Sequence, residues 1–357
     1  MSGFDYGNAR IRAMKSRLLA RRDFENLAGA TSLAGLLGAL TKTAYRKPVE
    51  LALARATGIE CIDEALRTDL ITTLGKIRSF YQDGEGEMVG LLLRTYDLHN
   101  LIAILRGLGN NVASDKILSA LLPVGELDLP ALAALSSAPG LRAAIDRMAS
   151  MHLPFALPLL KLRAEQPGAG VPQMELALQR WHFHQAQRRV AQLSGAEWLK
   201  AALDLEADLI NLRTALRFVH APAEREPVSE HTGLSRVRDL FVGPGQLSFA
   251  LLERLSQQEN LKQAVDLLSG AAYGPVLRLG LEMYRASGQL SDLERSLNRF
   301  RLSWMAALIK RDPLGIGLVL GYAALKVNEV SNLHWIANAI HLGLKYTAIQ
   351  ERLELAV

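Results

Sequence analysis

Cysteine is almost absent from this sequence, because Cys61 is the only one in 357 residues. A single cysteine excludes a disulfide framework within the chain and cannot build a cysteine-based metal site alone. Aromatic residues make up only 6%, and β-branched runs bounded by turn residues are scarce, so we expect no sizeable sheet. With 49% hydrophobic residues the chain has ample material for a folded core, in which Cys61 is expected to be a buried apolar filler.

Long hydrophobic runs are also missing. The longest apolar stretch, residues 314–325, ends at Lys326 and falls short of the roughly 20 residues that cross a bilayer as a helix. The N-terminus carries Arg10 and Arg12 without an apolar core, so no secretory signal is readable. We therefore expect a chain of the reducing cytoplasm that meets a membrane only through a partner.

Signatures of catalysis and cofactor binding are lacking as well. Gly315, Gly317 and Gly321 follow no predicted strand, and no Gly-Lys-Ser/Thr element is present, so a nucleotide loop is disfavoured. We interpret residues 312–313 as the start of a helix and the glycines as close-packing positions. No Gly-x-Ser-x-Gly elbow occurs either.

Histidines give no metal signature. His182 and His184 are two positions apart, which directs them to different sides of a helix. We therefore assign no catalytic, cofactor-binding or metal-binding residue. The net charge of +5 is small for this length, and stacking aromatics are not interleaved with cations, so nucleic-acid binding is not expected.

A block of five residues recurs three times in the chain. It consists of an acidic residue, two further residues and Asn-Leu, and the spacings between copies are 111 and 121 residues. The acidic and asparagine positions are Asp97, Asn100, Asp208, Asn211, Glu329 and Asn332. Periods this long indicate large repeated units rather than a short-repeat solenoid.

Two further blocks recur upstream in register. An acidic residue precedes the three asparagines by 37, 36 and 38 positions, at Asp63, Glu175 and Glu294. An apolar spacing of six and then four precedes it in each copy, at Leu27, Leu33, Leu37, Leu135, Leu141, Ile145, Leu255, Leu261 and Val265. Gly125 and Gly245 open the second and third copies. We therefore predict three repeat units, residues 1–122, 123–240 and 241–357.

Each motif is predicted to lie on an amphipathic helix. Apolar residues one, four and eight positions after each asparagine fall on one side of a helix with 3.6 residues per turn. The asparagine and the acidic residue border that apolar stripe and need partners, since a buried polar group left unpaired costs about 1–3 kcal/mol. We expect them to tie a helix to a neighbouring loop or helix inside each repeat. A catalytic or metal cluster would need residues more than a hundred positions apart to converge.

Several segments resemble one family, the C subunit (also called the d subunit) of V-type and archaeal-type rotary ATPases. The segments run in order along the chain and are residues 6–12 (Tyr-Gly-Asn-Ala-Arg-Ile-Arg), 93–101 (Leu-Arg-Thr-Tyr-Asp-Leu-His-Asn-Leu), 205–215 and 313–333. The resemblance implies an all-α fold of three similar helical units around a pseudo-three-fold axis, forming a funnel-shaped socket. Residues 123–168 and 221–233 match the family poorly, so the contacts made there are not implied.

The resemblance also implies a function and partners. In that family the protein is a non-catalytic part of the central stalk: it receives the end of the coiled-coil rotor shaft, sits on the cytoplasmic face of the membrane proteolipid ring, and couples ATP hydrolysis or synthesis to proton or sodium transport. It binds no nucleotide or other cofactor itself. The transported ion and the direction of the reaction are not implied.

The basic N-terminal segment is a second candidate site. Six cations occur within residues 10–22, and Arg10, Arg17 and Arg21, at offsets of seven and eleven, would share one face of a continuous helix. This face could be solvated, or it could contact acidic groups of a partner or lipid headgroups near the ring.

Two alternatives remain open from the residues alone. One is a soluble helical-repeat adaptor unrelated to rotary ATPases, which a three-unit helical repeat permits. The other is an all-helical enzyme with carboxylates in a central cavity, in which changing Asp97 would abolish turnover and leave the fold intact.

Overall fold

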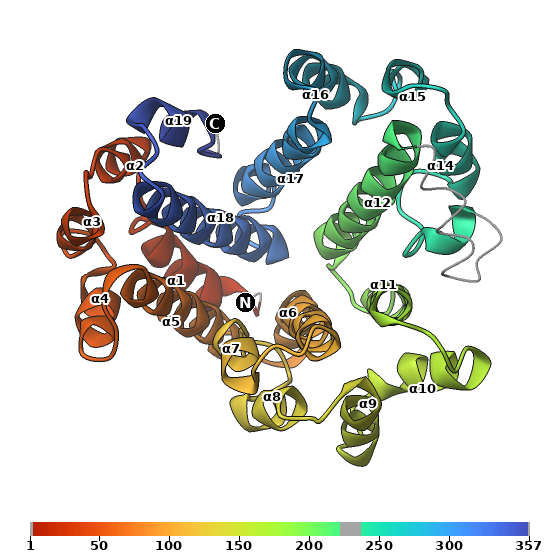
Figure 1. The fold of residues 1–357 in the computed structure, drawn as a ribbon, viewed down its shortest axis with the longest axis horizontal. Helices are drawn as coiled ribbons and strands as arrows, with labels where there is room; N and C mark the ends of the chain where they lie inside the picture. Colours follow the sequence, from red (N-terminus) through yellow and green to blue (C-terminus); the bar gives the residue numbers. More distant parts are fainter. Residues whose placement is uncertain (1–2, 222–236, 356–357) are drawn as a thin grey trace. The chain divides into compact units, whose positions relative to one another are not determined.

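The computed structural model describes residues 3–221 and 237–355, and in this part of the chain it contains helices and no strand (Figure 1). The prediction of an all-α fold is confirmed. Cys61 is fully buried, as expected of an apolar filler.

Within residues 3–221 and 237–355, three sets of five helices follow the same order, three short helices and then two long ones. The first set is α2 (Arg21–Ala28), α3 (Leu33–Leu40), α4 (Arg46–Leu53), α5 (Gly58–Ser79) and α6 (Asp83–Gly109). The second set is α8 (Leu129–Ser136), α9 (Leu141–Ser150), α10 (Ala156–Glu165), α11 (Val171–Val190) and α12 (Glu197–His220). The third set is α14 (Phe249–Ser256), α15 (Leu261–Leu267), α16 (Gly274–Ser287), α17 (Leu290–Arg311) and α18 (Ile316–His341).

Among the described residues, four smaller elements lie outside these sets. They are α1 (Asp5–Lys15), α7 (Ser114–Ser119), the 3₁₀ turn η2 (Val237–Leu240) and α19 (Tyr346–Glu351). Of these, α7, η2 and α19 each follow the second long helix of a set, which is the helix that carries the Asn-Leu motif.

The chain divides by compactness into two units. Residues 1–92 and 302–357 form the first, and residues 93–301 form the second. The division into residues 1–122, 123–240 and 241–357, and the funnel around a pseudo-three-fold axis, remain predictions.

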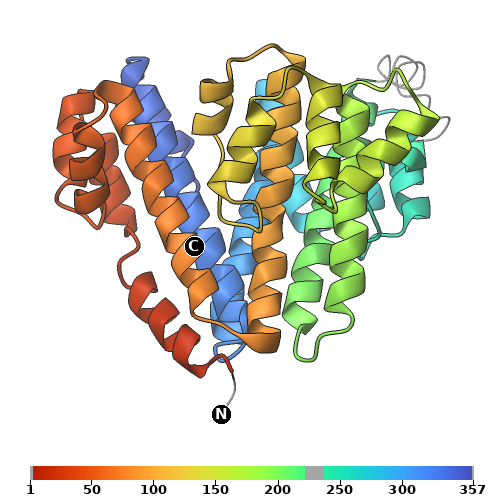
Figure 2. The ribbon, with the colours of Figure 1, turned by 90° about the horizontal axis from the view of Figure 1, so that it is seen from below.

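The first unit brings the two ends of the chain together. Helices α5 and α18 lie side by side along their lengths (orange and blue in Figure 2), and α1, α2 and α3 also pack on α18. Fully buried aliphatic side chains such as Ile62 and Leu66 of α5 and Val319 and Ile336 of α18 form its core. Burial of this apolar surface provides the main driving force for packing.

The second unit is built around the end of α6 and the helices that follow it. Buried residues of α6, including Leu101 and Leu105, pack with Leu132 and Leu135 of α8 and with Met148 of α9. The first helices of the second and third sets are capped by side chains at their N-termini: Asp128 accepts a hydrogen bond from the amide of Ala131, and Ser248 from that of Leu251. Such caps satisfy amide groups that have no partner within the helix.

The glycine-rich stretch after α17 differs in detail from the expectation. Residues 312–313 do not begin the helix; α18 begins at Ile316, and the carboxylate of Asp312 caps it by accepting a hydrogen bond of 2.7 Å from the amide of Gly317. Gly321 is a close-packing position, because a β-carbon there would lie 2.8 Å from the carbonyl oxygen of Met305.

Candidate functional site: three repeated polar ties

The first copy of the motif, on α6, binds the loop that leads into α8. Asp97 is fully buried, and its carboxylate accepts hydrogen bonds from the amides of Glu126 (2.8 Å) and Leu127 (3.1 Å). Asn100 donates to the carbonyl of Leu122 (2.7 Å) and accepts from the amide of the same residue (2.9 Å). The two side chains thus accept hydrogen bonds from three backbone amides of this loop, those of Leu122, Glu126 and Leu127.

The second copy, on α12, makes the same contacts with the loop before α14. The carboxylate of Asp208 accepts hydrogen bonds from the amides of Gln246 (3.0 Å) and Leu247 (3.1 Å). Asn211 donates to the carbonyl of Gly243 (2.9 Å) and accepts from the amide of Val242 (2.9 Å). The hydroxyl of Tyr273 adds a further hydrogen bond of 2.8 Å to Asp208.

The third copy, on α18, reaches both ends of the chain. Asn332 exchanges two hydrogen bonds with the backbone of Glu354, at 2.8 and 3.0 Å. Glu329 accepts hydrogen bonds from the amide of Leu19 (2.5 Å) and from the hydroxyl of Tyr45 (2.8 Å). The carboxylate of this tie therefore binds a segment 310 residues away along the sequence.

We call the hydrogen bonds that the acidic residue and the asparagine of one motif copy make with other segments a polar tie. The three ties involve equivalent positions of the chain. In each, the residue immediately before the N-cap of a set's first helix donates its amide to the carboxylate, and these residues are Leu19, Leu127 and Leu247. The first motif binds the second set, the second motif binds the third set, and the third motif binds the first set. The hydrogen bonds of the three carboxylates thus cross the predicted boundaries between repeats. This differs from the expectation that each motif would bind a segment of its own repeat.

Glycine explains how two of the loops come close to a short aspartate. A β-carbon on Gly125 would lie less than 3.0 Å from the carboxylate of Asp97, and one on Gly245 would lie less than 3.0 Å from that of Asp208. The position corresponding to these glycines at the third tie is Arg17, two residues before Leu19. There the motif has glutamate in place of aspartate, and its extra methylene spans the distance to a loop that carries a side chain.

Burial and hydrogen bonding act on the aspartates in opposite directions. Loss of hydration raises the pKa of Asp97, while the amides of Glu126 and Leu127 lower it, and the net shift is upward. The pKa of Asp208 is also raised overall, because burial raises it more than the hydrogen bonds from Tyr273 and the loop amides lower it. Each of these amides, and the hydroxyl of Tyr273, donates a hydrogen bond to a carboxylate oxygen and so stabilises the ionised form of the aspartate.

The third tie contains a buried ionic cluster. Lys326 is only 6% exposed, and its ammonium group lies 2.7 Å from Glu329, 2.7 Å from Asp69 and 2.8 Å from the hydroxyl of Tyr45. The ammonium also lies 4.4 Å from the centre of the Tyr45 ring. Burial, with Glu329 and Asp69 nearby, raises the pKa of Tyr45 well above its usual value, so this phenol stays neutral and donates to Glu329.

A second contact recurs beside each tie, and sequence reasoning did not assign it. The acidic residue of the upstream block pairs with a base on the motif helix of the preceding set. Glu175 accepts two hydrogen bonds from Arg106, at 2.6 and 2.5 Å, and Glu294 accepts one of 2.8 Å from Arg217. Both arginines stand six residues after a motif asparagine, and this equal spacing was a signal for the pairing.

At the third junction the same role falls to a histidine. Asp63 of α5 lies 2.9 Å from Nδ1 of His334 on α18, two residues after Asn332. Asn338 occupies the position six after the motif asparagine and donates to the backbone carbonyl of His334.

The basic N-terminal segment is not one helix. Helix α1 ends at Lys15 and α2 begins at Arg21, so the expectation that Arg10, Arg17 and Arg21 share one helical face is wrong. The chain must leave the helix here because the amide of Leu19 binds Glu329. All three arginines are exposed, and a contact of these residues with a partner or lipid stays a prediction.

The guanidinium groups have different surroundings. Arg10 lies 6.0 Å from the ring centre of Tyr6 and 5.5 Å from that of Phe80. Arg21 pairs with Glu25 at 3.1 Å. Contacts of this exposed kind contribute little to stability.

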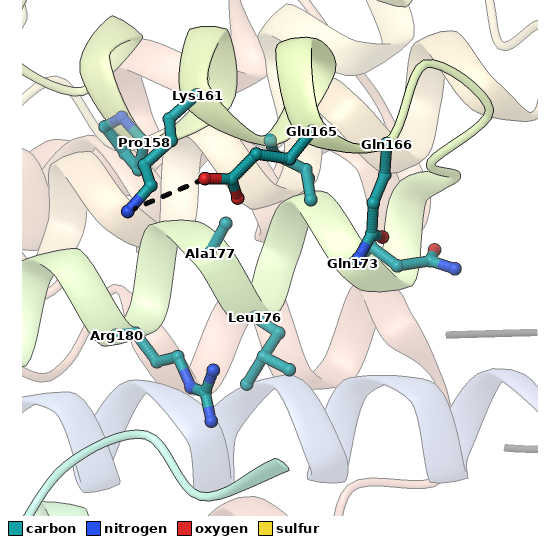
Figure 3. Close-up of a pocket in the computed structure, with 9 residues that line it drawn as sticks. Pro158, Lys161, Glu165, Gln166, Gln173, Leu176, Ala177 and Arg180 are labelled. Carbon is teal, nitrogen blue, oxygen red and sulfur yellow. Dashed lines mark ion pairs between the residues drawn. The ribbon is translucent and has the colours of Figure 1, made fainter. Parts of the chain in front are cut away.

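Two of the cavities lie among described residues of the second unit. One of about 270 Å³ lies between α10 and α11 (Figure 3), where Lys161 and Glu165 pair at 3.8 Å and Gln173 and Arg180 line the wall. Another, of about 750 Å³, is lined by Trp181, Phe249 and three arginines. Within residues 3–221 and 237–355 no group of three or more His, Cys, Asp or Glu side chains could hold a metal ion.

One described helix, α6, is long and apolar enough to cross a membrane by length and composition alone. Of its most apolar window, 61% is buried inside the protein, as in a helix that forms part of a core. Asp97 and Asn100 lie on this helix and bind a loop of the same chain.

Comparison with known proteins agrees with the repeated motifs. The family model described as "ATP synthase (C/AC39) subunit" matches residues 7–352. The chain is similar to the C subunit of the A-type ATP synthase from Pyrococcus abyssi, with 26% identity covering 98% of this chain and 89% of the relative. It is similar to the C subunit of the A-type ATP synthase from Haloferax volcanii, with 25% identity covering 98% and 97%. Because the family model matches residues 7–352, nearly the whole chain with all three copies of the motif, the chain belongs to the ATP synthase (C/AC39) subunit family.

Proposed function

We propose that the chain is a non-catalytic rotor subunit in the central stalk of a rotary A/V-type ATPase. It links the end of the coiled-coil rotor shaft to the membrane proteolipid ring, and so couples ATP hydrolysis or synthesis to proton or sodium transport. It works on the cytoplasmic face of the membrane as a peripheral part of the complex. The observation that carries this proposal is the match of the family model to residues 7–352.

The polar ties support the mechanical part of the proposal. Their carboxylates bind peptide amides, so their lone pairs are used to hold loops in place. A protein that transmits torque needs stiff connections between its parts, and buried hydrogen bonds with charged acceptors provide them.

The order of the ties supports a closed arrangement of three pseudo-equivalent units. The first motif binds the second set, the second binds the third, and the third returns to the first. An open row of repeats would leave the last motif without such a partner. We propose that the three units surround a pseudo-three-fold axis as a funnel-shaped socket for the shaft.

Membership of the family disfavours the adaptor unrelated to rotary ATPases. The enzyme alternative requires free carboxylates facing a cavity, whereas Asp97, Asp208 and Glu329 all accept hydrogen bonds from the backbone of another segment.

The proposal is tested in native membranes. The chain should co-purify with both the shaft subunits and the proteolipid ring. Removing it should leave ATP hydrolysis measurable while ion pumping is lost, and adding the wild-type chain back should restore pumping. Failure to associate with either partner would refute the rotor assignment. A turnover activity of the purified chain that is lost when Asp97 is changed, with the fold intact, would favour the enzyme.

The predicted contact of the arginines is tested by site-directed crosslinking. Cys61 is the only cysteine and is fully buried, so a Cys61→Ala background accepts single reporter cysteines. Arg10→Cys, Arg17→Cys and Arg21→Cys should crosslink to the ring or to the shaft. Leu157→Cys, at a side chain that is 63% exposed on α10, is the matched control. Equal crosslinking from all four positions would remove the assignment.

A further inference from the structure

The three junctions between consecutive sets differ in one chemical respect. At two of them the acidic residue of a long helix pairs with arginine, Glu175 with Arg106 and Glu294 with Arg217. At the third, between α5 and α18, Asp63 pairs with His334 at 2.9 Å. Arginine keeps its charge throughout the physiological pH range, whereas imidazole is the side chain that changes charge within it.

We propose that the α5–α18 junction is a pH-responsive contact, which strengthens when His334 takes up a proton and weakens when it loses one. The imidazolium presents Nδ1–H to the carboxylate of Asp63 and forms a charge-assisted hydrogen bond, about twice as strong as a neutral one. Neutral imidazole keeps this hydrogen bond only as the tautomer with the proton on Nδ1. The other neutral tautomer turns a nitrogen lone pair toward the carboxylate.

Among the described residues, the carboxylate that pairs with His334 is that of Asp63, and several charged groups on the elements packed against α18 have partners of their own. On α5, Glu64 and Arg67 lie 3.8 Å apart and pair with each other. Helix α3 carries no charged residue.

Several charged groups of the remaining elements are also engaged elsewhere. On α1, Arg12 donates to the carbonyl of Pro313, and on α2, Arg21 pairs with Glu25 while Asp23 accepts from the amide of Ala20. On α19, Arg352 lies over the ring of Trp335, 5.3 Å from its centre. On α18 itself, the ammonium of Lys326 is held by Glu329 and Asp69.

The location of this pair gives its protonation a structural consequence. Asp63 and His334 join the N-terminal and C-terminal parts of the chain, and α5 and α18 form the centre of the first unit. The pair is partly exposed, with 36% of the His334 side chain and 47% of the Asp63 side chain accessible, so the effect is modest and tunes the junction without abolishing it. The proposal rests on contacts within this chain and is independent of the rotor assignment.

The test is hydrogen exchange of α5 and α18 in the full chain at pH 5.5 and pH 8, expressed as protection factors that are corrected for the intrinsic pH dependence. In wild type we expect protection of these two helices to be roughly 2–5-fold higher at the lower pH, relative to α14 and α15, which contain no histidine, as internal references. His334→Asn should remove this difference, and His334→Arg should give high protection at both values.

A transfer variant provides the matched control. Arg217→His should create the same pH dependence at the junction of α12 with α17, and leave that of α5 and α18 unchanged. If His334→Asn does not fold, Asp63→Asn serves in its place and should likewise remove the difference in protection between the two pH values. Wild-type protection that is independent of pH, or a pH dependence that survives in His334→Asn, would overturn the proposal.

Discussion

Gly125, in the loop before α8, lies against Asp97 of α6, and the carboxylate occupies the space that a β-carbon on the glycine would need. The missing side chain lets the amides of Glu126 and Leu127 reach Asp97. The same relationship holds between Gly245 and Asp208. In the first two ties, therefore, the glycine two positions before the leucine leaves room for the aspartate of the motif.

The first prediction concerns this close approach. Gly125→Ala should lower the free energy of unfolding by about 1–3 kcal/mol, because the new methyl group pushes the loop amides away from a buried carboxylate that cannot retreat. Chemical denaturation measures the change. Gly140→Ala is the control, since nothing lies within 4 Å of a β-carbon there; an equal loss in both variants would contradict the explanation.

The second prediction concerns the carboxylate itself. Asp97→Ala should destabilise the chain by about 2–4 kcal/mol, because two buried amides lose their acceptor. Asp146→Ala removes an exposed partner of Arg163 in the same unit and should cost less than about 1 kcal/mol. An unchanged melting temperature for Asp97→Ala would argue against a structural role for the motif.

The third prediction concerns the ionic cluster of the third tie. Lys326→Met should destabilise the chain by about 3–5 kcal/mol, because Glu329 and Asp69 would remain together without a countercharge. Adding Glu329→Gln to this variant should recover part of the loss. Lys345→Met, at an exposed lysine, is the control in denaturant titrations. Without any rescue in the double variant, the electrostatic explanation would fail.

The fourth prediction concerns acid stability. Burial lowers the pKa of His182 from 6.5 to about 3, and its Nδ1 has no hydrogen-bond partner among the described residues. The unfolded chain therefore binds a proton that the folded chain excludes, so stability falls as pH drops from about 6.5 toward 3.

At pH 5 this difference amounts to roughly 2 kcal/mol for one histidine. His182→Phe should reduce the loss measured between pH 7 and pH 5, while His184→Phe, at an exposed position, should leave it unchanged. A pH profile of His182→Phe that parallels wild type would contradict the assignment.

Local patterns in the sequence were sufficient for the helices and for the positions of the motifs. Apolar residues one, four and eight after each asparagine mark helix faces, and the buried Leu101, Leu212 and Leu333 follow this prediction. The motif asparagines and acids were recognised as polar residues that need partners, and the hydrogen bonds of Asn100 and Asn211 are of that kind.

The partners themselves could not be found in the same way. Backbone amides such as those of Leu19 and Leu127 have no side-chain signature, so which loop a carboxylate binds is invisible in a pattern of residue types. The prediction of a continuous basic helix was wrong for the same reason. The helical spacing of Arg10, Arg17 and Arg21 does not reveal that the amide of Leu19 binds Glu329 and therefore lies outside a helix.

The sequence by itself determined the helical class, the order of the three motif copies and the family, because these depend on periodicity and on residues at fixed spacing. Only the tertiary structure decided that each carboxylate binds the next set, and that the third motif returns to the start of the chain. It also decided that Asp63 meets a histidine where its counterparts meet arginines. Contacts between residues hundreds of positions apart depend on how whole helices pack, and no local pattern encodes that.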